Sequence, residues 1–372
     1  CIEFSANNCF VGMLTPQSFM FLTSLLRTRQ LILDNTVIDS FLHLEYGAIE
    51  DAYVDLVGFC FRNAKPTNKS SSRFFRLISS KIDKRQKFEQ LLNLLNKNPK
   101  TSVSDIYLIL QNKLTIIPGE PFAYWLSDDF INLFTGDLLE KVLASAARTK
   151  TSENDKYLRY KWEVPSTEIN TKWRPYTKGG DYSRWFQIFD WVVLWTEETI
   201  AHFRESSDCR ITEEEYWYIE GITFSAISKK GFSARYLPPG FIFDVAGPCL
   251  FSKGRFDKSK PDFDMYILGL LNSVFGIYCQ VILNPTVNYQ TNDIKRIPYV
   301  KPTNNQENKV TQLVNECISM KRVLLSIDIH SSDFKKSSLV GSKTSFLDEF
   351  KSNKIYFQSA IKKIEENEKE LN

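Results

Sequence analysis

Val54-Asp55-Leu56-Val57-Gly58-Phe59-Cys60-Phe61 is a run of eight residues with a single charged side chain. Such a continuously apolar run is typical of a strand that is covered on both faces. Two earlier runs, Val37 to Leu44 and Phe10 to Leu14, also read as strands. Between these two, Thr15-Pro16 offers an N-cap and a first-turn proline for a helix that should extend to about Leu33. This alternation of strands and a helix predicts an α/β sheet.

The loop Glu45-Tyr46-Gly47-Ala48-Ile49-Glu50-Asp51 connects the second and third of these strands. Ligands of α/β sheets bind beyond the strand ends, so the loop is a candidate for lying over a site. An ordinary polar connection explains the same residues and is favoured from the sequence alone.

Composition limits the class of protein. The chain has 372 residues, 43% of them hydrophobic, which is enough for a large core and for two or three units. A net charge of +3 does not mark a protein that is basic overall, so any nucleic-acid surface must be local. Seven cysteines without a Cys-x-x-Cys pair are typical of reduced thiols in the cytoplasm. Three scattered histidines give no metal-ligand cluster.

Met265 to Leu283 is the one candidate for a membrane span. It is near the lower length limit and contains polar residues and glycines, with no anchoring residues beside it, so a buried helix is favoured and no membrane contact is expected. Elsewhere, Asp83 and Gln86 form a capping pair for a helix to about Asn96. Further elements are expected as helices at 123–134, 308–327 and 344–371, strands at 191–195, 221–227 and 241–245, and a turn with a short strand within 284–298.

The run Lys172-Trp173-Arg174-Pro175-Tyr176-Thr177-Lys178-Gly179-Gly180-Asp181-Tyr182-Ser183-Arg184-Trp185 concentrates cations and aromatic rings. Cations bind phosphate, and aromatic faces hold sugars or bases. The two glycines would let backbone amides approach a phosphodiester. The run therefore predicts a nucleic-acid contact loop. From charge and composition alone the plainer alternative is favoured, namely a hairpin in which Gly-Gly is only a turn.

Two short motifs resemble catalytic ones only superficially. Pro248-Cys249 is similar to the Pro-Cys nucleophile of cytosine-methylating enzymes, but no cofactor turn accompanies it and a packed small hydrophobe is favoured. Asn284-Pro285-Thr286 is not the Asn-Pro-Pro-Tyr with which aminomethylating enzymes hold a flipped adenine, and it reads as a helix-terminating turn. No Gly-x-Gly turn stands between a strand and a helix. No catalytic or metal-binding residue is predicted.

Ordered sequence blocks nevertheless carry a family resemblance. They are Ile117-Pro118-Gly119 through Ala123-Tyr124-Trp125, Lys172 to Gly180, Glu220-Gly221-Ile222-Thr223, Pro239-Gly240-Phe241-Ile242-Phe243-Asp244, and Leu283-Asn284-Pro285-Thr286 through Ile297-Pro298. Together they resemble the adenine-specific DNA methyltransferases of the BREX phage-resistance systems, relatives of the fused type II restriction-modification methylases, over nearly the whole chain. The resemblance implies a partial class I methyltransferase (Rossmann-like) sheet at 1–115. It also implies an α/β DNA target-recognition domain at 116–302 and a C-terminal helical tail at 303–372.

Two motifs of that family are absent from the chain. They are the glycine-rich turn for S-adenosylmethionine and the Asn-Pro-Pro-Tyr motif that aims a flipped adenine at the methyl donor. Both should precede Cys1, so the chain is expected to be a C-terminal piece whose partner is the missing N-terminal methyltransferase half. S-adenosylmethionine is then expected for the full-length enzyme and not for this chain. The chain alone should bind double-stranded DNA without transferring a methyl group.

The DNA-contact candidates follow from residue type and from the resemblance. Positioning of the DNA backbone is expected from Lys172, Arg174, Tyr176, Lys178, Gly179, Gly180 and Arg184. Base edges are expected to be read by Ser228, Lys229, Lys230 and Arg235 in a loop between strands, with Asn288 and Gln290 as weaker candidates. The alternative is a protein-interaction module that docks another defence-system subunit or a phage inhibitor. Salt distinguishes the two, because counterion release makes duplex binding fall steeply as salt rises.

Overall fold

The computed structural model describes residues 2–44, 48, 54–78, 83–97, 105–256, 265–337 and 345–372. Apart from Ala48, the loop predicted at 45–51 lies outside these residues. The chain divides into two compact units: Cys1–Asp137 with Ile282–Pro285, and Leu138–Val281 with Thr286–Asn372. Both units combine helices and strands, so the predicted α/β class is confirmed.

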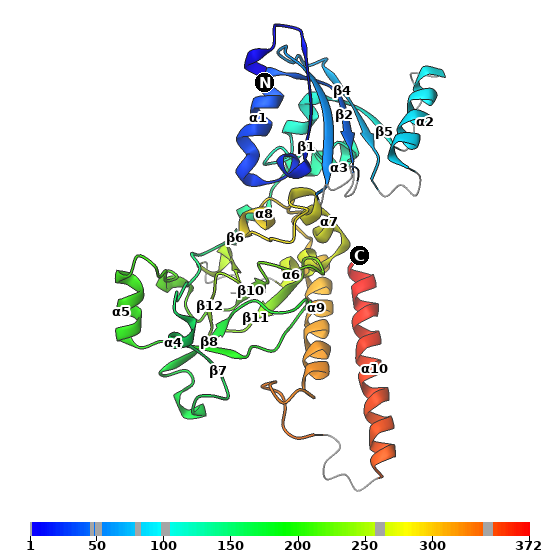
Figure 1. Cartoon of the computed structure of the whole chain (residues 1–372). Helices are drawn as coiled ribbons and strands as arrows, with labels where there is room; N and C mark the ends of the chain where they lie inside the picture. Colours follow the sequence, from blue (N-terminus) through cyan, green and yellow to red (C-terminus); the bar gives the residue numbers. More distant parts are fainter. Residues whose placement is uncertain are drawn as a thin grey trace. The chain divides into compact units, whose positions relative to one another are not determined.

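The first unit is built on one five-stranded sheet with the order β1-β3-β2-β4-β5 (Figure 1). Its strands are β1 (Phe10–Pro16), β2 (Val37–His43), β3 (Leu56–Arg62), β4 (Ser71–Arg76) and β5 (Ile106–Leu110). β3 runs antiparallel to both of its neighbours, β2 and β4 are parallel, and β4 and β5 are antiparallel. The three apolar runs between residues 10 and 61 therefore form adjacent strands, as the sequence predicts.

The helix start predicted at Thr15-Pro16 is wrong, because both residues belong to β1. β1 lies at the edge of the sheet, where a proline is tolerated since its nitrogen can face away from the neighbouring strand. Two short 3-10 turns follow, η2 (Gln17–Met20) and η3 (Thr23–Leu25). The helix α1 (Leu26–Asn35) begins only after them.

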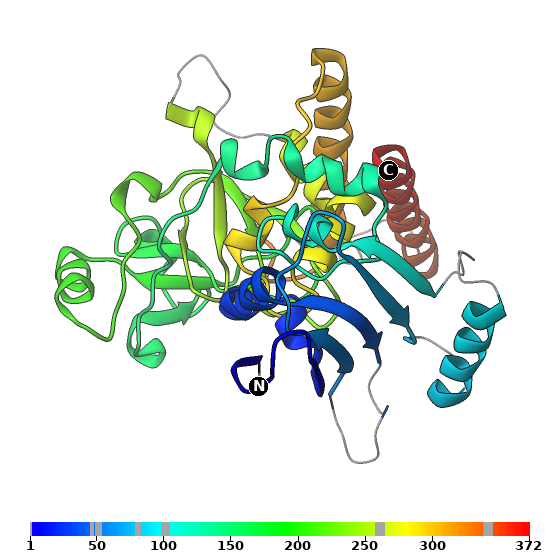
Figure 2. The ribbon, with the colours of Figure 1, turned by 90° about the horizontal axis from the view of Figure 1, so that it is seen from above.

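β3 is fully covered on one face only, whereas the sequence predicts two covered faces. Its odd-numbered residues from Val57 to Phe61 face α1 and belong to a buried aromatic core. On the other face α2 (Lys84–Lys97) packs through Leu91 over the β4 and β5 side of the sheet, and Figure 2 shows it beside β5. Leu14 and Leu108 stay exposed on that face because α2 does not extend over them.

In the first unit, local capping determines where one helix begins, and core packing shortens another predicted helix. Asp83 caps α2 as predicted, since its Oδ1 accepts a hydrogen bond of 3.0 Å from the Gln86 amide. The helix predicted over 123–134 is reduced to α3 (Asp128–Asn132) and one following 3-10 turn. Tyr124 is instead inserted into the aromatic core, where it is 1% exposed.

The second unit contains two four-stranded sheets with the orders β11-β10-β13-β6 and β12-β8-β9-β7. The strands of the first sheet are β6 (Leu143–Ala144), β10 (Gly221–Phe224), β11 (Ala234–Leu237) and β13 (Cys249–Ser252). Those of the second are β7 (Leu158–Tyr160), β8 (Trp173–Thr177), β9 (Trp191–Leu194) and β12 (Ile242–Phe243). Neighbouring strands are antiparallel except β8 and β12. The strands predicted at 191–195, 221–227 and 241–245 are confirmed at shorter length.

The remaining helices are α4 (Asn154–Tyr157), α5 (Glu197–Glu205), α6 (Met265–Asn272), α7 (Val274–Leu283), α8 (Thr291–Lys295), α9 (Asn304–Leu325) and α10 (Phe346–Leu371). α9 and α10 confirm the two predicted C-terminal helices and lie side by side (Figure 1, Figure 2).

The single helix predicted at 265–283 is bent by 68° between α6 and α7. Gly276 permits the bend, because a Cβ there would lie 2.1 Å from the carbonyl oxygen of Leu270. Within the part of the chain that the structure describes, no single helix has the length and apolarity to cross a membrane. The bent pair meets that test only when its two helices are taken together.

Candidate nucleic-acid interface

Three of the four aromatic side chains of the run Lys172–Trp185 belong to the protein core, and the fourth, Tyr182, is half-buried. Trp173 and Trp185 are 8% and 1% exposed, and Tyr176 is completely buried. The Tyr176 hydroxyl donates a hydrogen bond of 2.7 Å to Oδ2 of Asp244, and burial beside this carboxylate raises the pKa of Tyr176 well above its ordinary value. The prediction that Tyr176 contacts DNA is wrong, because its side chain does not reach the surface.

The arginines of the same run are held by protein groups. The Arg174 guanidinium lies over the ring of Tyr218, 4.5 Å from its centre. Arg184 forms an ion pair of 3.1 Å with Glu368 of α10. Both side chains are half-buried, whereas Lys172 is exposed. Arg174 and Arg184 therefore act first in packing. Lys172 also has a partner, Glu168 at 3.7 Å, but its greater exposure makes it the better placed of the three for a phosphate.

Lys178 lies at one end of an aromatic stack that the sequence does not reveal. Its Nζ is 5.2 Å from the centre of the Trp191 ring. Tyr160, Trp162 and His330 continue the stack, with successive ring centres 4.1, 4.6 and 4.4 Å apart. Partial burial lowers the pKa of Lys178. The rings come from three separate segments, so only the folded chain brings them together.

The packing around Gly179 and Gly180 favours a structural turn over a phosphate cradle. Both have a positive φ, +76° and +135°. Their carbonyl oxygens accept hydrogen bonds of 3.0 Å from Gln187 Nε2 and 2.6 Å from Ser225 Oγ. A Cβ on Gly179 would lie 2.6 Å from the carbonyl oxygen of Ala246. The absence of a side chain at Gly179 is thus required by the fold itself.

Arg235 lies beneath this turn and not in a loop. It is part of β11 and completely buried. Its guanidinium donates to the Asp181 carbonyl at 3.1 Å, to Ser225 Oγ at 2.7 Å and to Gln187 Oε1, while its Nε has no partner among the described residues. Burial lowers the pKa of Arg235 to about 10. The prediction that Arg235 reads a base is wrong, because the side chain supports the turn from inside.

Two segments predicted separately to read base edges are joined in the structure. The first, residues 225–233, connects β10 to β11, and the second is residues 286–290. We call them the paired loops. The Ser228 amide donates to the Val287 carbonyl at 3.0 Å, and the Tyr289 amide donates to the Ala226 carbonyl at 2.8 Å. The paired loops bring together five predicted residues: Ser228, Lys229, Lys230, Asn288 and Gln290.

The paired loops present a polar and positively charged surface. Lys229, Lys230, Asn288 and Gln290 are exposed, and Ser228 is half-buried. Neither segment contains Asp or Glu, so no acidic residue within them offsets the two lysines. Amides, hydroxyls and lysines of this kind contact base edges and phosphates. The short strand predicted within 284–298 is reduced to isolated bridges at Asn288 and Pro298, with α8 between them.

The thiol of Cys249 is not placed for nucleophilic attack. Its side chain is 1% exposed, and burial raises its pKa to about 12. A buried neutral thiol packs as a small hydrophobe, which the sequence favours for Pro248-Cys249. Among the described residues, no group of three His, Cys, Asp or Glu side chains is arranged to hold a metal ion.

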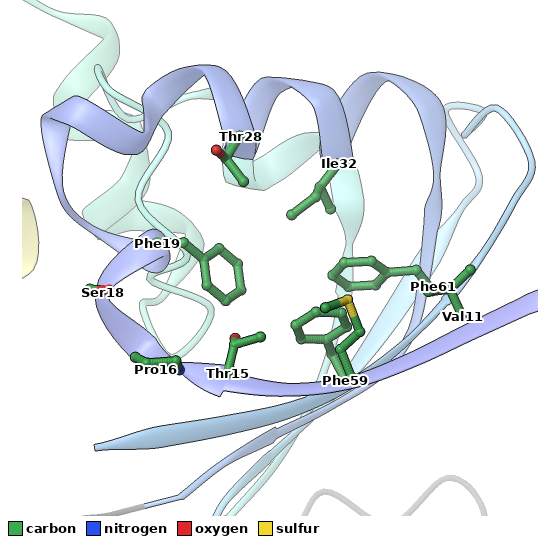
Figure 3. Close-up of a pocket in the computed structure, with 10 residues that line it drawn as sticks. Val11, Thr15, Pro16, Ser18, Phe19, Thr28, Ile32, Phe59 and Phe61 are labelled. Atoms are coloured by element: carbon green, nitrogen blue, oxygen red, sulfur yellow. The ribbon is translucent and has the colours of Figure 1, made fainter. Parts of the chain in front are cut away.

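The first unit contains a cavity of about 430 Å³, and the residues that line it show whether S-adenosylmethionine would fit there. α1 and β1 bound it on opposite sides, and Phe19, Phe59 and Phe61 project into it (Figure 3). Its polar lining is limited to Thr15, Ser18 and Thr28, without a charged side chain. S-adenosylmethionine carries a sulfonium, a carboxylate and an ammonium group that need polar partners. The residues that line this cavity do not fit S-adenosylmethionine.

The fold is similar to that of a solved restriction-modification enzyme. The DNA complex of the type IIL restriction-modification enzyme MmeI matches 98% of this chain and 47% of that chain, with a TM-score of 0.50 and 12% identity. At this identity the match shows a shared fold. No protein-family model matches the chain.

Two curated adenine-specific methyltransferases are similar to this chain in sequence. The adenine-specific methyltransferase BrxX of Escherichia coli O9:H4 (strain HS) is 28% identical over 348 residues, which are 90% of this chain and 27% of the relative. The adenine-specific methyltransferase PglX of Lacticaseibacillus casei (strain Zhang) is 27% identical over 337 residues, 85% of this chain and 27% of the relative. The predicted resemblance to the BREX adenine-specific methyltransferases is confirmed. The chain spans about a quarter of the length of these relatives.

Proposed function

We propose that this chain is the DNA target-recognition part of a site-specific adenine-N6 DNA methyltransferase of a BREX-type phage-defence system. The second unit binds double-stranded DNA through the paired loops, and Lys172 adds a contact to the DNA backbone, with Lys178 as a weaker contributor because its ammonium lies over the Trp191 ring. The chain itself transfers no methyl group. In this proposal an N-terminal methyltransferase half contains the cofactor-binding and catalytic motifs and binds S-adenosylmethionine.

The observation that carries the proposal is the pairing of two loops 60 residues apart. The side chains of Ser228, Lys229, Lys230, Asn288 and Gln290 alone made them candidates, and the backbone hydrogen bonds Ser228–Val287 and Ala226–Tyr289 hold their two loops together. Sequence-specific proteins need several base-reading side chains on one rigid support, flanked by cations for phosphates. Amide, hydroxyl and lysine groups at one place satisfy that requirement.

In the same proposal the first unit contains the end of the methyltransferase sheet. β3 lies antiparallel between β1 and β2, which are joined through α1. This strand arrangement supports the expected class I remnant within 1–115. Target recognition within 116–302 and the helical tail at 303–372 remain part of the proposal, and the first compact unit extends to Asp137. Other defence-system subunits are further proposed partners, and the cytoplasm is the proposed compartment.

Salt dependence of duplex binding tests the proposal. Affinity of the full chain for a fluorescent duplex of arbitrary sequence is measured by anisotropy at several salt concentrations. The variant Lys229→Ala/Lys230→Ala should flatten the log-log salt slope by about 1.8, since each phosphate contact contributes about 0.9. The control Lys351→Ala/Lys354→Ala removes the same charge from exposed positions of α10 and should leave the slope unchanged.

Each outcome has a clear meaning. Equal slopes for the wild-type chain and the Lys229→Ala/Lys230→Ala variant would show that the paired loops do not contact phosphates. Equal flattening in the α10 control would show a general charge effect in place of a local surface. Absence of duplex binding in the wild-type chain would favour the protein-interaction module.

A further inference from the structure

Ile227 is an exposed apolar residue in an otherwise polar and basic loop. It is 66% exposed, although Ser228, Lys229 and Lys230 follow it directly. A single exposed aliphatic side chain is common on protein surfaces and needs no explanation by itself. Ile227 is significant because of the residue with which it pairs. Ile227 forms the β-bridge with Asn288, an exposed residue predicted to read a base.

The hydrogen bonds on either side of the bridge fix its geometry. The Ser228 amide binds the Val287 carbonyl, and the Tyr289 amide binds the Ala226 carbonyl, so Ile227 and Asn288 are a pair without mutual hydrogen bonds. In such antiparallel pairs the Cα atoms lie about 4.5 Å apart and both side chains project from the same face. The face carries one aliphatic and one amide side chain. Val287, opposite Ser228, projects from the other face.

The bridge rests on a packed base. Tyr289, next to Asn288, is 7% exposed, and its ring centre lies 5.5 Å from that of Phe232. Phe232 contacts the ring of Phe224 in β10 at the same distance. Both loops are therefore anchored to one sheet, which positions Ile227 without relying on a mobile loop tip.

The chemistry of this face matches one feature of duplex DNA. In the major groove an adenine–thymine pair offers the N6 and N7 groups that an asparagine binds, and the thymine C5-methyl that an apolar side chain contacts. The segments 225–233 and 286–290 contain two lysines and no acidic residue, so their charge is complementary to DNA.

We infer that Ile227 is a specificity-determining residue that contacts the C5-methyl group of a thymine in the major groove, beside the base read by Asn288. The inference rests on the proposed function. Ile227 supplies discrimination through one apolar contact and contributes nothing to phosphate binding.

The test compares two pools of randomised duplex DNA, one synthesised with thymine and one with deoxyuridine, which lacks the C5-methyl group. The full chain is allowed to bind each pool, and the bound duplexes are sequenced. The wild-type chain should enrich a thymine position in the first pool. That preference should fall about fourfold in the second, since one buried methyl contributes about 0.8 kcal/mol.

Variants identify the side chain responsible. Ile227→Ser should lose the difference between the pools, and Ile227→Val, which keeps a branched apolar group, should retain it. Val287→Ser is the matched control, because it removes an exposed aliphatic side chain from the opposite face, and it should keep the difference. Melting temperatures of all variants check that exposed substitutions leave the fold intact.

Failure of this inference is distinguishable from failure of the proposed function. Duplex binding with sequence preference that is equal in both pools overturns the role of Ile227 and leaves the DNA-binding proposal standing. A pool difference that persists in Ile227→Ser assigns the methyl contact elsewhere and also overturns the inference. Absence of duplex binding, or binding without any enriched sequence, overturns both the inference and the recognition role on which it rests.

Discussion

Substitution of Gly179 by alanine should destabilise the second unit for two reasons. The φ of +76° lies in the left-handed region, which costs an L-residue about 1–2 kcal/mol. The added Cβ would also lie 2.6 Å from the Ala246 carbonyl oxygen, a backbone atom that cannot rotate away. Overpacking of this kind costs about 1–3 kcal/mol. The sum is about 2–5 kcal/mol, or about 4–20 °C in melting temperature for a unit of this size.

Gly240→Ala is the matched control for the packing contribution. Gly240 has a φ of +99°, and a Cβ there would meet no atom within 4 Å. Since +99° is further than +76° from the left-handed minimum near about +57°, the backbone strain at Gly240 is no smaller. Any excess destabilisation of Gly179→Ala over Gly240→Ala therefore measures the contact with Ala246.

Calorimetry of the two variants gives the melting temperatures, and duplex affinity is measured at 15 °C, where both stay folded. If Gly179 forms only a structural turn, Gly179→Ala should melt at a lower temperature than Gly240→Ala. Its affinity for duplex DNA should stay within about twofold of that of the wild-type chain, since a loss of about 1.4 kcal/mol in binding free energy would already lower the affinity tenfold. Equal melting of the two variants would refute the packing argument. A large loss of affinity at normal stability would restore the phosphate-cradle hypothesis for Gly179.

Two further predictions follow from shifted pKa values. Burial, and then the nearby Arg76, lower the pKa of His43 from 6.5 to about 4, so the unfolded chain binds a proton that the folded chain does not between these values. The free energy of unfolding of the first unit should be highest above pH 6.5 and fall by about 3 kcal/mol as the pH drops to 4. Calorimetry of His43→Gln should lack this part of the pH dependence, and an unchanged profile would contradict the assignment. Cys249, whose pKa is about 12, should resist alkylation at pH 8 while exposed Cys9 reacts, as measured by peptide mass spectrometry. Comparable labelling rates would show that Cys249 is accessible and reactive.

Three of the five strands that the structure describes in the first unit were predictable because they lie in largely apolar runs, whereas β4, with the sequence Ser-Ser-Arg-Phe-Phe-Arg, and β5 were not predicted. Val37 to Leu44 and Val54 to Phe61 need no distant partner to be recognised as strands. Local capping was readable for the same reason, as Asp83 shows. The capping box formed by Thr303 and Gln306 at the start of α9 was missed, although its spacing in the sequence is the standard signal and would have moved the predicted start from Asn308 to Asn304.

The surface was less predictable because exposure depends on partners that are distant in sequence. Tyr176 and Arg235 have the residue types of a nucleic-acid contact, yet both are completely buried. The Tyr176 hydroxyl is hydrogen-bonded to Asp244, and the terminal nitrogens of Arg235 are hydrogen-bonded to Asp181, Ser225 and Gln187. A buried arginine that is hydrogen-bonded in this way has no local pattern that distinguishes it from an exposed one.

The basic run and the paired loops show why charge in a sequence is not charge at a surface. Arg184 finds its carboxylate 184 residues away in α10, and Lys178 lies over the ring of Trp191. An ion pair cancels most of the field of its cation, and a cation over a ring loses part of its hydration and freedom to reach a phosphate. Lys229 and Lys230 lie in segments without acids and are exposed. Under the proposed function, the two adjacent lysines are therefore expected to contribute more to DNA attraction than the longer basic run, because attraction depends on charge that solvent and ligand can reach.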